Sequence, residues 1–214
     1  LWVSRAAAES LLLLLILLLL PAYPAAGAAA PTRTGSPPFS PGEKLIYAGR
    51  WGPVPAGEVS LEVLPMERID GAEAYHFAMT TKTNAVVDLL YKVRERQESF
   101  TDAGMTRSLL YKKRTESKHP RDVIVTFDWG KGEALYANFG RVSPPLRVPP
   151  GSFDPLALLF ALRLYELREN AVIEIPVSDG QMNYRVKVTV AGRDILEIQG
   201  TAVPAFEVVP DMKR

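Results

Sequence analysis

The chain has 214 residues, with 25 Lys and Arg against 24 Asp and Glu, and a formal net charge of +1. This near balance argues against a general nucleic-acid-binding protein, which usually carries a basic excess on one face. There is no cysteine. That excludes a disulfide framework, a thiol nucleophile, a thiolate metal site and a lipid-modified N-terminal cysteine.

Residues 1–28 have the pattern of a secretory signal peptide. Arg5 supplies a positive charge, Leu11 to Leu20 is an unbroken apolar run, and Ala26-Gly27-Ala28 is the best cleavage site. Ten apolar residues fall well short of the roughly 20 that span a bilayer. We therefore expect cleavage, export to the periplasm and no stable transmembrane span afterwards, with an uncleaved membrane anchor as the alternative.

Residues 29–38 are small and rich in proline, which predicts a disordered linker before a single β-rich domain at 39–214. Short segments of alternating polarity separated by turn residues are typical of antiparallel hairpins. No βαβ alternation is present, so no parallel sheet is expected. Turns are expected at 52–57, 70–71, 102–104, 129–132, 179–180 and 192–194, and a helical turn at 84–90. Strands are expected at 43–51, 58–64, 75–82, 91–100, 108–118, 123–128, 133–139, 172–177, 183–191, 195–198 and 201–209.

One long helix is expected at Asp154 to Glu169. Asp154 can cap its free amide groups, and Pro155 suits the first helical position. The segment is apolar nearly all round until Arg168, so it must be covered on more than one side. The sequence therefore predicts a mainly β fold in which a curved antiparallel sheet, like half of a barrel, wraps one buried helix.

Several blocks of the sequence resemble the bacterial family called "domain of unknown function 3108". They are Pro38-Phe39-Ser40-Pro41-Gly42-Glu43-Lys44-Leu45-Ile46-Tyr47 with Trp51-Gly52-Pro53-Val54-Pro55-Ala56-Gly57; Thr83-Asn84 with Leu90-Tyr91-Lys92-Val93-Arg94; Glu98-Ser99; and Phe153-Asp154-Pro155-Leu156 with Leu162-Arg163. The resemblance runs from about Phe39 to Val209. It implies an exported protein of the Gram-negative envelope, with a curved half-barrel similar to periplasmic lipoprotein carriers.

Members of that family usually continue beyond the equivalent of Val208-Val209-Pro210 with further strands. This chain stops at Arg214 and begins with Leu. We therefore expect the domain to be truncated at its C-terminus and to expose an unpaired sheet edge.

No catalytic or metal site is expected, and no cofactor. His76 and His119 stand far apart without a further ligand at metal-binding spacing. Glu95 and Glu98 fall on opposite faces of a strand, so they do not form the carboxylate pair of a glycosidase. Gly130-Lys131-Gly132 lacks the spacing of a phosphate loop and reads as a hairpin tip.

The strand at 91–100 is unusual because neither of its faces is cleanly apolar. Two accounts are open: a solvated face with weak ion pairs, or a basic strip beside aromatic residues that meets an anionic head group or glycan. The candidate ligand-binding residues of the second account are Trp51, Tyr91, Arg94, Arg96, Tyr111 and Arg114.

Two functions follow from these patterns. The first is a non-catalytic binding or carrier module with an apolar cavity between helix and sheet, rimmed by Arg94, Arg96 and Arg114, for a lipid or another amphipathic envelope molecule. The second is a structural or interaction protein that docks another envelope protein through its sheet. An enzyme comes third, because no cluster of titratable residues is evident.

Overall fold

The computed structural model describes residues 32–213 except 53 and 199, and it leaves the side chain of Trp51 undescribed. The expected signal peptide at 1–28 and residues 29–31 of the expected linker therefore lie outside the described residues. The same holds for any role of the Trp51 side chain in binding.

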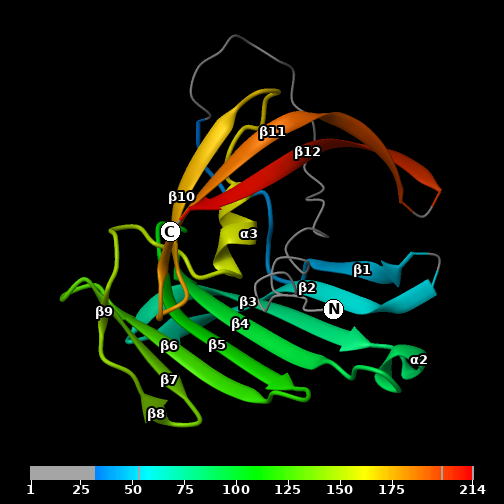
Figure 1. Cartoon of the computed structure of the whole chain (residues 1–214). Coiled ribbons are helices and arrows are strands. Elements are labelled where there is room, and N and C mark those ends of the chain that lie inside the picture. The colour runs from blue at the N-terminus through cyan, green and yellow to red at the C-terminus, as the bar shows by residue number, and fades with distance from the viewer. Residues whose placement is uncertain (1–31, 53, 199, 214) are drawn as a thin grey trace.

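The larger of two sheets has nine strands in the order β1-β2-β3-β4-β5-β6-β7-β8, with β9 also paired to β7. All pairs are antiparallel, so the chain meanders from one strand to its neighbour (Figure 1). A short helix, α2 (Ala85–Asp88), connects β3 to β4. The strands are β1 (Lys44–Trp51), β2 (Val54–Ile69), β3 (Ala72–Thr83), β4 (Arg94–Asp102), β5 (Ser108–Glu116), β6 (Arg121–Asp128), β7 (Glu133–Asn138), β8 (Arg141–Val142) and β9 (Leu146–Arg147).

The smaller sheet has three antiparallel strands, β10 (Val172–Ser178), β11 (Asn183–Ile198) and β12 (Thr201–Lys213). The mainly β, antiparallel prediction is confirmed, but the strands form two sheets and not one curved sheet. Two expected turns are wrong: residues 54–57 form the beginning of β2, and residues 192–194 lie within β11, where a bulge after Val190 shifts the register.

The helix expected at Asp154 to Glu169 is much shorter. Only α3 (Ala157–Leu162) is helical, and it lies between the two sheets (Figure 1). The helix also begins later than expected, at Ala157 and not at Pro155, but the Asp154 carboxylate does accept hydrogen bonds from free amides there, those of Leu156 and Ala157, each at 2.9 Å. The apolar segment predicted a buried element correctly but not how far the helix extends.

Contacts distant in sequence end the helix. The backbone beyond α3 pairs with the segment before β1: Thr34 N–H donates to Leu164 C=O at 2.6 Å and Glu166 N–H to Thr32 C=O at 3.0 Å, with a bridge from Arg33 to Tyr165. The chain leaves α3 through a turn at residues 163–164 and is no longer helical at Tyr165, which forms the bridge. Residues 32–34 were expected to be part of a disordered linker, and the structure instead holds them in these hydrogen bonds.

The core is one continuous cluster that includes residues of α3 and of both sheets. Phe160 of α3 stacks on Phe77 of β3 with ring centroids 3.9 Å apart, and Phe39 meets both rings edge-on. All six residues of α3 are buried. The large sheet thus has an inner face, which packs on α3, and an outer face.

Candidate binding site

The structure does not bring together the five predicted ligand-binding residues whose side chains it describes, which are all but Trp51. Since side chains alternate along a strand and cross-strand partners share a face, the register places Arg94, Arg96 and Arg114 on the outer face. Tyr111 is buried on the inner face and donates its hydroxyl to Gln97 at 2.7 Å. Tyr91 lies exposed in the connection between α2 and β4. The expected basic rim of an inner cavity is therefore not formed by these arginines.

On the outer face, acidic and basic side chains pair with each other. Arg96 donates to Glu98 at 2.9 Å, and buried His76 lies between Glu98 at 3.2 Å and Glu67 at 2.8 Å while stacking on Phe100. Partial burial would raise the pKa of Glu98, but the hydrogen bonds and charges of Arg96 and His76 hold this pKa below its ordinary value. These contacts fit the account of a solvated face with ion pairs.

Arg94 has a structural role at the base of α2. Its guanidinium donates to both carboxylate oxygens of Asp88 and to the carbonyl of Thr83 at 3.0 Å. The hydrogen bonds from Arg94 and Thr83 hold the pKa of Asp88 below its ordinary value. Asn84 caps α2 by accepting from the amides of Val86 and Val87. The family-like block at Thr83-Asn84 and Leu90 to Arg94 therefore builds one rigid turn.

Two other family-like blocks meet at Asp154, which is fully buried. Its carboxylate accepts from the hydroxyls of Ser99 and Ser108, each at 2.6 Å, besides the two amides at the start of α3. Burial raises the pKa of Asp154 against the opposing effect of these donors. With every donor satisfied, Asp154 is a structural link between α3 and strands β4 and β5.

Arg163, just after α3, forms an ion pair with Glu43 and packs over the ring of Phe39 with its guanidinium carbon 5.3 Å from the centroid. This pair joins the first family-like block to the last. The phenol of Tyr47 lies in the field of both charges: burial raises its pKa, Arg163 opposes that change and Glu43 adds to it. Tyr47 therefore keeps its proton and can donate a hydrogen bond.

The inner face carries a connected polar network beyond the part covered by α3. Glu95 accepts from Gln97 at 2.6 Å and from Thr115 at 2.9 Å, and it pairs with Lys113 at 3.2 Å. The Glu95 side chain is only 10% exposed. We call the set on this face the inner polar cluster; its members are Tyr47, Thr81, Glu95, Gln97, Tyr111, Lys113 and Thr115.

Two hydroxyls of this cluster are buried without a hydrogen-bond partner among the described residues: Tyr47 Oη and Thr81 Oγ1. They lie in one row across the sheet, since Tyr47 pairs with Val59, Val59 with Thr81, and Thr81 with Glu95. A buried polar group without a partner costs roughly 1–3 kcal/mol, so such groups are normally satisfied. The row thus presents two hydroxyls that a bound molecule could satisfy.

Sequence reasoning did not select this cluster. It placed Glu95 and Gln97 on the strand face opposite to the arginines, which is correct, but it assigned ligand binding to the arginine face. The alternation that puts Tyr111 on the same face as Lys113 was the signal that could have found it.

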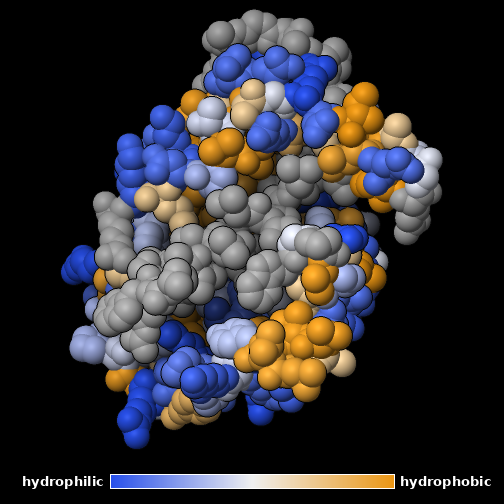
Figure 2. Space-filling view, turned by 45° about the vertical axis from the view of Figure 1, so that its right-hand side comes forward, coloured by the Kyte–Doolittle hydropathy of each residue, from blue (hydrophilic) through white to orange (hydrophobic). Residues whose placement is uncertain are grey.

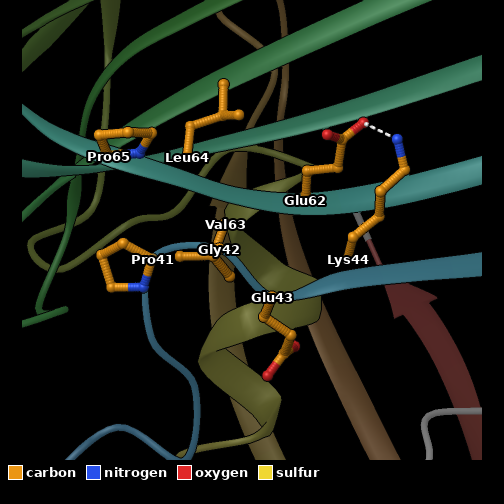
Figure 3. Close-up of a pocket in the computed structure, with 8 residues that line it drawn as sticks. All are labelled: Pro41, Gly42, Glu43, Lys44, Glu62, Val63, Leu64 and Pro65. Carbon is orange, nitrogen blue, oxygen red and sulfur yellow. Dashed lines mark ion pairs between the residues drawn. The ribbon is translucent and has the colours of Figure 1, made fainter.

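A hollow of about 350 Å³ lies beside the start of β1 and the second half of β2. Figure 3 shows the Lys44–Glu62 ion pair, 3.3 Å long, on one side of it, while Glu43 turns away toward α3. The hollow is open and shallow, and its charged residues are paired with each other or with Arg163. It offers no unpaired group for chemistry.

Within the described part of the chain, no group of three or more His, Asp and Glu could hold a metal ion. No helix among residues 32–213, as far as they are described, is long and apolar enough to cross a membrane.

The chain was compared with protein families, curated proteins and solved structures. No curated protein and no solved structure matches it. The family model described as "Protein of unknown function (DUF3108)" matches residues 46–214 and so confirms the resemblance seen in the sequence blocks. Because the match covers most of the chain, the protein belongs to the DUF3108 family.

Proposed function

We propose that the protein is an exported, non-catalytic binding module for an amphipathic, lipid-like molecule of the cell envelope, which it holds on the inner face of the large sheet. Export rests on the signal-like pattern of residues 1–28. Binding rests on one observation, the buried and unpartnered hydroxyls of Tyr47 and Thr81 beside the polar network of Glu95.

The chemistry of the inner polar cluster defines the head group that fits. Lys113 and Glu95 neutralise each other, so the cluster favours a head group that is zwitterionic or uncharged and rich in hydrogen-bonding groups. Leu45, Val59 and Met79 lie on the same face and provide an apolar surface for a chain. Sites for small molecules are typically lined by apolar side chains with a few well-placed polar groups.

Replacing Thr81 tests this site. Thr81→Val removes one hydroxyl at nearly constant volume, and we expect it to weaken binding of monomeric lysophosphatidylethanolamine by about tenfold, the worth of one buried hydrogen bond. Isothermal titration calorimetry below the micellar concentration measures this change. Thr80→Val is the matched control, because Thr80 lies on the outer face and pairs with Ser60 and Arg96. Equal affinities for the two variants, or no binding by the parent chain, contradict the proposal.

A second function is favoured by the free edges of both sheets. Among the described strands, β1 has only β2 as a neighbour and β12 only β11, and β12 is 13 residues long. An extended segment of another envelope protein could add to such an edge through backbone hydrogen bonds. A parent chain that binds no amphiphile but forms a complex through β12 would favour this second function.

A further inference from the structure

The connection between β3 and β4 exposes a group of large apolar side chains. Leu89 is 85% exposed, Leu90 82% and Val86 64%. We call this group the α2 tip; its members are Val54, Val86, Leu89, Leu90 and Tyr91. Figure 1 shows α2 at one end of the large sheet, and Figure 2 shows apolar residues gathered on this part of the surface. A contiguous apolar patch of this kind marks an interaction surface.

The tip is presented by a rigid base and not by a loose loop. Asn84 caps the turn and donates its side-chain amide to the carbonyl of Pro55 at 2.5 Å. Arg94, Asp88 and Thr83 bond to one another beneath it. The leucines are thus held outward, although each would gain by burying its side chain.

The backbone of the tip is suited to an apolar phase. The amide of Asp88 donates to Asn84 C=O at 2.9 Å, and the amides of Leu90 and Tyr91 both donate to Val87 C=O, at 2.9 and 2.7 Å. Unpaired backbone groups are what normally keep loops out of a bilayer. Here the amides of Asp88, Leu90 and Tyr91 are bonded within the turn, and the charge of Asp88 is neutralised by Arg94.

Charge around the tip points to an anionic surface. Lys82 is paired with Glu58 and Arg94 with Asp88, whereas exposed Lys92 has no ion-pair partner within the described chain. Tyr91, with an apolar ring and a polar hydroxyl, stands between the leucines and Lys92. An aromatic ring and a lysine flanking an apolar tip match the headgroup region of a bilayer.

We infer that the α2 tip inserts into the surface of an anionic phospholipid bilayer and holds the protein there. A bilayer surface receives exposed leucines without needing a complementary protein surface, and its anionic head groups complement the charge of Lys92. The inference does not depend on the ligand proposed for the inner face. It does place that site next to a membrane, since Thr83 at the base of the tip lies two residues beyond Thr81.

Vesicle flotation tests the tip. The protein is purified as the cell produces it, and all variants share its N-terminus, so any contribution of residues before the domain is constant. With vesicles of phosphatidylethanolamine and phosphatidylglycerol, we expect the double variant Leu89→Ser/Leu90→Ser to reduce the partition coefficient on the order of tenfold or more. Lys92→Gln is expected to reduce it about fivefold on these vesicles and not on pure phosphatidylcholine.

The matched control is Phe139→Ser/Val142→Ser, because these side chains are 60% and 61% exposed near β8, away from α2. It is expected to bind vesicles like the parent. Loss of partitioning in the control equal to that in the tip variant overturns the inference, as does a tip variant that binds like the parent. Calorimetry with the monomeric lysolipid separates this result from the inner-face site, since tip variants are expected to keep that affinity.

Discussion

Asp154→Ala is expected to lower the free energy of unfolding by roughly 3 to 5 kcal/mol, because it removes a helix cap and leaves buried donors without acceptors. Those donors are the hydroxyls of Ser99 and Ser108 and the amides of Leu156 and Ala157. Urea denaturation followed by circular dichroism measures the change. The control is Asp211→Ala, whose carboxylate is exposed and 3.8 Å from Lys213; we expect a loss below about 0.5 kcal/mol.

The pH dependence of stability provides a second readout for Asp154. Burial raises the pKa of its carboxyl above the ordinary value of 3.8. The folded state therefore keeps the proton to higher pH than the unfolded chain, and the stability linked to that proton is lost as pH rises through the folded pKa. Asp154→Asn cannot titrate and is expected to remove this part of the slope. An unchanged slope in the Asn variant would contradict the assignment.

Gly57→Ala is the other substitution with a large expected effect. A Cβ on Gly57 would lie 2.2 Å from the carbonyl oxygen of Lys82 and 2.9 Å from Cα of Thr83, both backbone atoms of β3. Strand β2 must then move away from β3, and we expect a loss of about 2 to 3 kcal/mol. Thermal or urea unfolding measures it.

Gly49 offers a matched control in the neighbouring strand. Gly49 and Gly57 are paired in the register of β1 and β2, but a Cβ on Gly49 meets its nearest atom, the carbonyl oxygen of Gly57, at an ordinary 3.5 Å. Gly49→Ala is expected to change stability by less than about 1 kcal/mol, in either direction. Equal losses at the two positions would show that close backbone approach is not the reason for glycine at 57. Because Gly57 pairs with Thr83, Gly57→Ala is also expected to weaken vesicle binding through the α2 tip.

The strands could be predicted from the sequence because the information is local. Alternation located β7 to within one residue, whereas β6 and β3 begin two and three residues earlier than expected. Asp70-Gly71 is the turn between β2 and β3, with both residues at positive φ. The cap by Asp154 was predictable for the same reason. Local signals failed where a strand is bulged: β11 continues through Gly192, which the sequence pattern marked as a turn.

The extent of α3 and the division into two sheets were not predictable in this way. The segment from Leu156 to Leu167 is largely apolar and would be buried whether it were helical or extended, so polarity cannot locate the end of the helix. Pairing of residues 164–166 with residues 32–34 and the ion pair of Arg163 with Glu43 set that end. Both depend on residues more than 100 positions away.

The candidate site shows the same limit. The alternation of side chains along the strand correctly placed Arg94 and Arg96 on one face and Glu95 and Gln97 on the other. It could not tell which face α3 would cover, because both faces of β4 carry charged residues. Packing of Phe160 on Phe77 decides this, and it moves the ligand proposal from the arginines to the inner polar cluster.

Native mass spectrometry of the chain purified gently from a periplasmic extract tests the central claim, that the inner face binds an amphipathic molecule, most directly. We expect a folded charge-state distribution with a reproducible excess mass, from a molecule that extracts into organic solvent. The fraction of protein that carries this molecule is expected to be lower in Thr81→Val and unchanged in Thr80→Val. A folded protein that carries no excess mass, and acquires none when offered monomeric lysophosphatidylethanolamine, would contradict the claim.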